Sequence, residues 1–210
     1  MSISLSLVNA EKEIKTAGFA ALAGEINKRI IRTIPSVVEK VKQAVERSIS
    51  SQHTIIALSD YYAGGLAAEL GLNPGQGPLA ASQIVSIITE DTEFRFNKLN
   101  NKLKGSIEFY IAHNAIDKLL SLPVGHVLYG KGDLHWLRWL LMRGDDIIVS
   151  NYTYNAKTGF GRSGGGSMML GGSWRVPPEH SGDSENNFIS KALFNKEFQT
   201  ELENIFTRYI

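Results

Sequence analysis

The segment at residues 134–193 constrains the fold of this chain more than any other. It holds all three tryptophans, two runs with strand character, nine of the twenty glycines and the Pro177-Pro178 step. A helix that is apolar on most sides has to be buried, glycine permits turns that other residues resist, and proline fixes the backbone. The segment therefore predicts a buried aromatic helix and a proline-anchored last helix, joined by a glycine-rich connection.

The first 50 residues have the pattern of two helices. Apolar residues repeat every four positions over residues 14–30, and a capping-box sequence follows at residues 36–39. Pro35 lies between them, lacks an amide hydrogen and disfavours helical geometry at the residue before it. We therefore predict that Pro35 ends the first helix and that residues 1–50 form a helical hairpin.

The middle of the chain mixes helical spacing with strand alternation. Helices are expected at residues 60–70, 79–88 and 114–120, and strands at residues 92–97, 106–111 and 126–129. The strands at 92–97 and 106–111 are predicted to pair as a hairpin with a basic tip that contains Arg95, Lys98, Lys102 and Lys104. Basic residues beside Phe94 and Phe96 also suit a nucleic-acid stacking surface, but alternating aromatics favour a buried strand face.

The last third predicts two strands between two helices. Asp133 is the expected N-cap of a helix at residues 134–143 that ends at Gly144. Strands are expected at residues 147–149 and 167–170, and Asp183 or Ser184 is expected to cap the last helix.

The predicted fold class is α+β, with one domain over residues 1–210. It comprises the N-terminal helical hairpin and a small, mainly antiparallel sheet packed with helices. A long C-terminal helix follows. The body at residues 51–210 carries the glycine-rich loop at residues 158–173.

Composition narrows the class of protein. Hydrophobic residues make up 43% of the chain and charged residues 20%, as in a globular protein, and the net charge of +1 argues against general nucleic-acid affinity. Cysteine is absent, which excludes disulfides and thiolate metal sites. The chain has neither a secretory signal pattern nor the run of about 20 apolar residues that a membrane span needs. We therefore expect synthesis in a reducing cytoplasm.

No motif predicts a catalytic, cofactor-binding or metal site. Residues 159–164 match the dinucleotide pattern GxGxxG, but strand-like residues follow where that fold needs a helix. The Asp145-Asp146 pair is interpreted as a solvated turn and not as a metal site. His113 and Asp117 are four residues apart, so a small hydrolase using His113, Asp117 or Asp145 stays open as an alternative.

Three parts of the segment carry a resemblance to a known family. They are WLRWLLMRGDDIIVSNY, GRSGGGSMML and WRVPPEHSGDSENNFISKAL. In this order they resemble the C-terminal half of the neck, or tail-completion, proteins of tailed double-stranded-DNA bacteriophages. The N-terminal half lacks the Pro-x-x-Thr-Gly step of the better-known members, so nothing is carried over to it.

The resemblance implies a non-enzymatic virion subunit without a cofactor. Such a subunit forms a homo-oligomeric ring, a hexamer or dodecamer, at the head–tail junction, and phage DNA passes through the ring. Its neighbours would be portal-side or adaptor-side proteins and tail-side proteins, with no membrane. A tail-tube terminator or another connector ring in the same virion is the alternative.

The candidate interface and scaffold residues come from two sources. By the resemblance, the shared scaffold includes Trp136, Trp139, Arg143, Trp174, Arg175, Pro177 and Pro178. Met142 is added because methionine, tryptophan and arginine are enriched at interface centres. Arg162, Gly164, Gly165 and Gly166 form the connection, which is interpreted as slack chain between two rigid parts. Which residues are core and which are subunit contacts is left open.

Overall fold

A computed structural model describes residues 10–60, 62, 64–129, 132–161 and 163–209. The elements as far as the end of the first β-hairpin are α1 (Ala10–Ser50), α2 (His53–Ser59), α3 (Leu66–Glu69), α4 (Gln76–Glu90), β1 (Thr92–Asn97) and β2 (Ser106–Ile111). The following elements are α5 (Ala115–Leu120), the 3-10 turn η1 (Pro123–Gly125), β3 (Val127–Tyr129), β4 (Gly132–Leu134), α6 (Trp136–Arg138) and the π-helical η2 (Trp139–Arg143). The last are β5 (Val149–Asn155), β6 (Ser167–Trp174), α7 (Phe188–Leu193) and α8 (Lys196–Tyr209). The predicted α+β class is confirmed.

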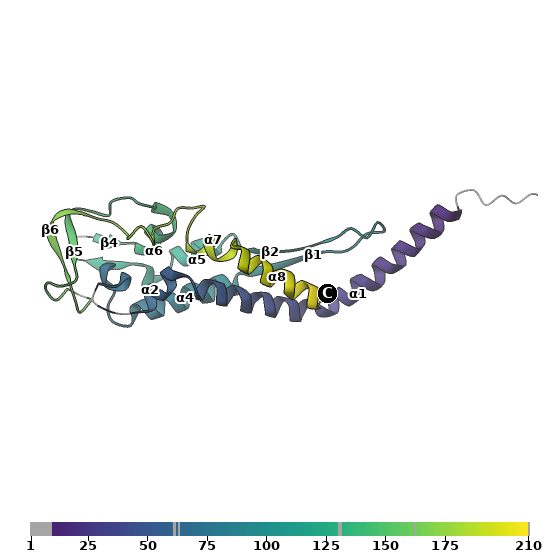
Figure 1. The fold of residues 1–210 in the computed structure, drawn as a ribbon, viewed down its shortest axis with the longest axis horizontal. Coiled ribbons are helices and arrows are strands. Elements are labelled where there is room, and N and C mark those ends of the chain that lie inside the picture. The colour runs from purple at the N-terminus through teal and green to yellow at the C-terminus, as the bar shows by residue number, and fades with distance from the viewer. Residues whose placement is uncertain (1–9, 61, 63, 130–131, 162, 210) are drawn as a thin grey trace, which may run out of the picture.

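Helix α1 runs through Pro35 without a break, so the predicted N-terminal helical hairpin is wrong. Pro35 lies on the exposed side of the helix, whereas Val37 and Val41 are buried on the other side. Packing of that buried side against α4 and α8 outweighs the one hydrogen bond that proline removes. Figure 1 shows that α1 bends between the body and its projecting N-terminal part, and proline is a usual cause of such a bend.

The strands form three separate antiparallel pairs and not one sheet. The predicted hairpin of β1 and β2 is confirmed, with Thr92 opposite Ile111 and Asn97 opposite Ser106. Strands β3 and β4 form a short second pair, and β5 pairs with β6. Two strands alone are marginally stable, and the β1–β2 pair packs Phe94 and Phe109 against the core. Most residues of β5 and β6 are exposed.

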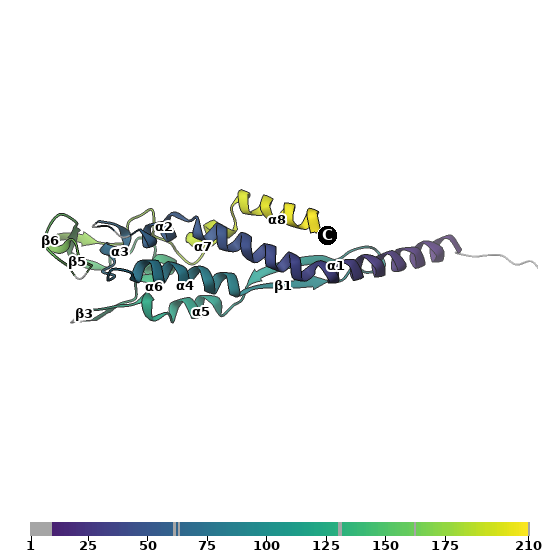
Figure 2. The same ribbon diagram turned by 90° about the horizontal axis from the view of Figure 1, so that it is seen from below.

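The tip of the β1–β2 hairpin lies against α1. Asn27 of α1 donates a hydrogen bond from Nδ2 to the backbone oxygen of Leu99 at 2.9 Å, and its Oδ1 accepts one from the Leu99 backbone nitrogen at 2.8 Å. Leu103 turns the tip with a φ of 56°. The tip is thus fixed to the helix and extends along it, as Figures 1 and 2 show.

The core is one continuous cluster inside the body. It takes residues from α1, α2, α4, α5, α6, η2 and α7, among them Ile49, Leu58, Ile84, Leu119 and Trp136. The molecule is elongated, with the N-terminal part of α1 at one end and the β5–β6 hairpin at the other (Figures 1 and 2). No helix in the described part of the chain is long and apolar enough to cross a membrane.

Three predicted element boundaries need correction. Leu134 belongs to β4 and the aromatic helix begins at Trp136, because Asp133 binds His126 Nδ1 at 2.8 Å and does not cap the helix. The last helix is divided into α7 and α8, and Asn187 caps α7 in place of Asp183 or Ser184. The predicted buried strand at residues 147–149 is also wrong, since Ile147 is 53% exposed and β5 begins only at Val149.

The helix expected at residues 60–70 is confined to Leu66–Glu69 in the described chain, and α2 was not predicted. Helix α2 is only seven residues long, too short for a clear helical period.

Candidate functional site

Two of the candidate tryptophans belong to the core of the body. Trp136 is completely buried, and its Nε1 donates a hydrogen bond to the backbone oxygen of Val124 at 2.8 Å. Trp174 is buried at the end of β6, where its backbone oxygen accepts a hydrogen bond from Ile148. Because these side chains are buried within one chain, they stabilise the subunit and do not contact another.

Trp174 also borders the partly buried carboxyl group of Glu69. Burial raises the pKa of Glu69, and the Trp174 indole N–H opposes this rise to a smaller extent. The indole N–H does not reach hydrogen-bond geometry with any described residue.

Of the other candidate residues of the aromatic helix, Met142 and Arg143 are exposed and Trp139 is half-buried. The Arg143 guanidinium lies 5.6 Å from the centre of the Trp139 ring, and Met142 is exposed beside them. Arg175 forms an ion pair with Asp145 at 2.6 Å. Arginine, methionine and half-buried tryptophan on one surface are typical of interface centres.

The two prolines shape the chain after β6. The backbone oxygen of Pro177 accepts hydrogen bonds from the amide nitrogens of His180 at 2.9 Å and Ser181 at 3.1 Å. Pro178 is exposed next to it. The step forms a turn that leads toward the cap of α7, and Pro178 is more exposed than half-buried Pro177.

The glycine tract forms the hydrogen-bonded end of the β5–β6 hairpin and is not slack chain. Gly164 and Gly166 have φ angles of 81° and 71°, in the region that favours glycine. A Cβ on Gly166 would come within 2.4 Å of the Tyr154 hydroxyl, and that hydroxyl donates to the Gly165 backbone oxygen. Arg162 lies outside the described residues. Because a strand follows the glycines, the rejection of a dinucleotide-binding loop agrees with the structure.

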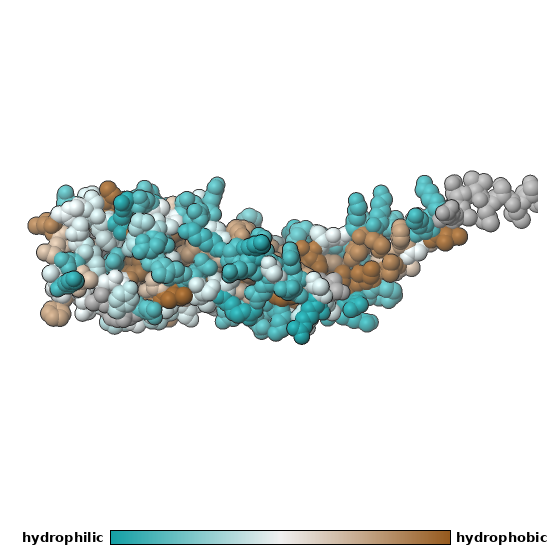
Figure 3. All heavy atoms as spheres, in the orientation of Figure 1, coloured by the Kyte–Doolittle hydropathy of each residue, from teal (hydrophilic) through white to brown (hydrophobic). Residues whose placement is uncertain are grey.

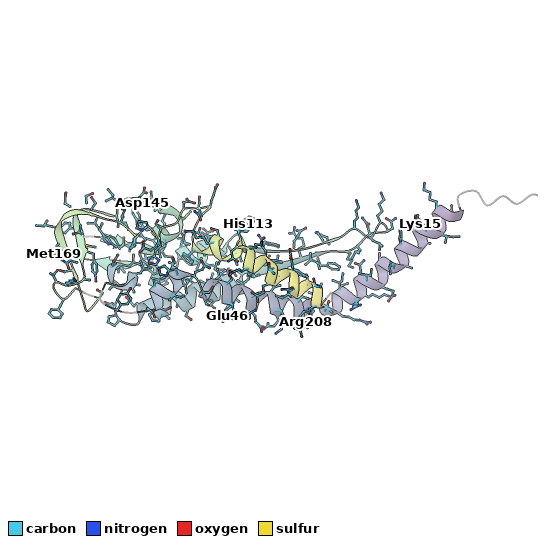
Figure 4. The ribbon with its side chains drawn as sticks, viewed as in Figure 1. Lys15, Glu46, His113, Asp145, Met169 and Arg208 are labelled. Atoms are coloured by element: carbon cyan, nitrogen blue, oxygen red, sulfur yellow. The ribbon has the colours of Figure 1, made fainter. Side chains whose placement is uncertain are left out.

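A set of apolar side chains on the β5–β6 hairpin escaped the sequence interpretation. Phe160 is 98% exposed and Leu170 is 81% exposed, and Tyr152, Met168 and Met169 are exposed near them. Figure 3 shows brown, apolar surface at this end of the molecule, and Met169 marks it in Figure 4. The available signal was that Phe160 stands between two glycines and Leu170 precedes two more, so no neighbouring side chain can cover them.

Two stacked histidine pairs are the main titratable clusters. His180 is buried, stacks on His53 with 4.7 Å between ring centres, and has Nδ1 3.3 Å from the Thr54 hydroxyl. Burial, and then the neighbouring His53, lower the pKa of His180. His135 stacks on His126 at 3.9 Å, and burial followed by His126 lowers its pKa as well.

The three residues of the hydrolase alternative do not form one cluster. His113 and Asp117 are exposed, and His113 precedes α5, so their spacing of four residues does not place them on one helix face. Asp145 lies away from His113 in Figure 4 and is paired with Arg175. In the part of the chain that the structure describes, no group of three or more acidic, histidine or cysteine side chains is arranged to hold a metal ion.

The comparisons leave the chain without an assigned family. No family model matches its sequence, and neither a curated protein nor a solved structure matches it.

Proposed function

We propose that this chain is a structural virion protein of a tailed double-stranded-DNA phage. Copies of it form a ring at the head–tail junction, as a neck or tail-completion protein, and phage DNA passes through the ring. Its partners are further copies of itself, portal-side or adaptor-side proteins, and tail-side proteins. The resemblance over residues 134–193 suggests this role, and the proposal does not depend on any enzymatic chemistry.

The observation that carries the proposal is uncovered apolar surface at both ends of an elongated subunit. Ile14 of α1 is 72% exposed at one end, and Phe160 and Leu170 are exposed at the other. Lys15 and Met169 mark these two ends in Figure 4. Contiguous exposed apolar surface is uncommon on monomeric proteins and is typical of surfaces that bind other proteins. A subunit with a neighbouring protein at each end would bind one neighbour through each of these surfaces.

The charge of the chain is compatible with a DNA conduit. Its net charge is +1, and proteins that bind DNA tightly gain their affinity from many phosphate contacts by lysine and arginine. DNA has to slide through a connector, so a nearly neutral subunit avoids a strong hold on the phosphates.

Electron microscopy provides the test. The purified chain is expected to form closed rings with a central opening, and immunogold labelling of virions is expected to mark the head–tail junction. Label at the tail end of the junction would indicate the tail-tube terminator position in the same particle. A monomeric protein that is absent from virions would contradict the proposal.

A further inference from the structure

The N-terminal part of α1, residues 12–24, is a helical arm. No other described element packs against most of its length. Every residue from 12 to 22 is exposed, including Leu22 at 48%. Residues 17–24 read Ala-Gly-Phe-Ala-Ala-Leu-Ala-Gly and carry no charge. Apolar helix surface of this kind is normally buried. Figure 3 shows the brown surface of this arm beyond the body of the molecule.

The body carries a surface groove between α2 and α4 that is closed at one side by the end of α1. Its volume is about 640 Å³, and its lining includes Ile56, Ala81, Ser82 and Val85. Small alanine and serine side chains allow a partner helix to approach closely. The exposed carboxylates of Glu46 and Glu90 also line the groove, and of the described residues that line it none is basic.

We infer that the helical arm of one copy binds in the α2–α4 groove of a neighbouring copy. Residues 78–90 of α4 along the groove span about 18 Å, a length that 13 residues of the arm supply. Amphipathic helices bind apolar grooves through side chains spaced three and four residues apart. Lys12, Lys15, Phe19 and Leu22 have this spacing on one face of the arm.

The charges of the two surfaces are complementary. Lys12 and Lys15 are exposed and form no ion pair with any described residue. Glu46 and Glu90 are likewise outside every ion pair in the described part of the chain. Lys42 donates to the backbone oxygen of Glu90, and the Glu90 carboxylate accepts a hydrogen bond from the Ser86 hydroxyl at 2.8 Å. Two lysines of the arm thus meet two glutamates of the groove, and none of the four has an ion-pair partner among the described residues.

An arm cannot reach the groove of its own chain. Helix α1 is continuous from Ala10 to Ser50 and carries both the arm and one wall of the groove. Leu22 and Glu46 are therefore separated by about 36 Å along the same helix. Lys15 and Glu46 lie far apart along α1 in Figure 4. The arm that occupies the groove therefore comes from a second copy, and a head-to-tail contact of this kind forms a ring where the rotation between copies closes.

Single-cysteine crosslinking tests the contact directly, because the chain has no cysteine of its own. One chain carries Lys15→Cys in the arm and the other carries Ser82→Cys in the groove. A short bismaleimide is expected to give a mixed dimer in high yield. The matched control is Ser121→Cys, another exposed serine that does not line the groove. Equal yields with Ser82→Cys and Ser121→Cys would overturn the inference.

Self-association measured by sedimentation gives an independent readout. Leu22→Glu is expected to weaken association at least about tenfold, since it removes one buried leucine from the contact. Ala20→Glu adds the same charge on the opposite side of the arm and is expected to have little effect. Circular dichroism checks that both variants fold. A wild-type chain that stays monomeric, or a Leu22→Glu variant that associates normally, would contradict the contact.

The arm contact rests on the self-association that the proposed function includes, but different results would reject the arm contact and the proposed function. Rings that persist with Leu22→Glu, together with label at the head–tail junction, would reject the arm contact and keep the proposed function. Association that depends on the arm in a protein absent from virions would keep the arm contact and reject the proposed function.

Discussion

At the scale of single residues, buried His180 and half-buried His135 make the stability of the fold depend on pH. His180 and His135 both have a pKa lowered below 6.5, mainly because burial penalises the charged ring. The unfolded chain therefore binds more protons than the folded one as the pH falls below about 6.5. The stability that the neutral rings contribute is complete above this pH and is lost as the pH falls toward the folded pKa.

We expect the free energy of unfolding to be lower at pH 5.5 than at pH 7.5, as measured by urea titration. The His180→Asn variant removes one of the two groups and should reduce this difference. His113→Asn changes an exposed histidine outside both stacked pairs and serves as the control. An unaltered difference in His180→Asn would show that the His53–His180 pair does not cause the pH dependence.

Asn27 holds the tip of the β1–β2 hairpin through two hydrogen bonds to Leu99. Asn27→Asp replaces the donor Nδ2 with an oxygen that faces the Leu99 carbonyl, so the tip should detach at a cost of about 1–3 kcal/mol. Hydrogen exchange at residues 98–104 is expected to accelerate. Lys28→Ala, at an exposed neighbouring position, should leave exchange at the tip unchanged. Unchanged exchange in Asn27→Asp would mean that other contacts hold the tip.

At the scale of elements, α1 illustrates how tertiary packing overrides a local signal. Pro35 predicted a break, yet the helix continues because Val37 and the apolar residues after it are buried against the body. Proline inside a helix costs up to about 3 kcal/mol. Burial of the apolar residues after Pro35 offsets this cost. The bend at the proline sets the direction of the arm.

Pro35→Ala is therefore expected to raise the free energy of unfolding by about 1–3 kcal/mol, because it restores a backbone hydrogen bond. It should also straighten α1, which small-angle scattering of the monomer would detect. Ser36→Ala is the matched control at the next exposed position of the same helix. If stability rises while assembly falls, the bend serves the arrangement of subunits. A variant that is no more stable than the wild type would contradict this interpretation of Pro35.

At the scale of the whole molecule, the two exposed ends should affect assembly without affecting folding. Phe160 is 98% exposed, so Phe160→Ser should change the free energy of unfolding by less than about 0.5 kcal/mol. The same variant should reduce incorporation into particles or rings, because it removes an apolar contact at the β5–β6 end. Lys157→Ser, exposed in the same loop, is the control. Normal incorporation of Phe160→Ser would exclude this end as a contact surface.

The sequence predicted some residues of the candidate site and missed others, for different physical reasons. The sequence identified Trp136 and Trp174 as important without deciding between core and contact, because a tryptophan suits both. It missed Phe160 and Leu170, because periodicity detects buried faces and not side chains that a turn leaves exposed. The sequence showed the apolar repeat of the arm, but it did not predict that these side chains are exposed. Their exposure depends on whether other elements of the fold extend far enough to pack against the arm.

The sequence by itself determined the features that depend on neighbouring residues. These are the α+β class, the β1–β2 hairpin with its alternating aromatics, and the strand after the glycines that rules out a dinucleotide-binding loop. Only the tertiary structure decided the continuity of α1, the three separate strand pairs and the exposure of the arm and the β5–β6 hairpin. The physical reason is that turns and periodicity act over a few residues, whereas burial is decided by contacts between segments far apart in the chain.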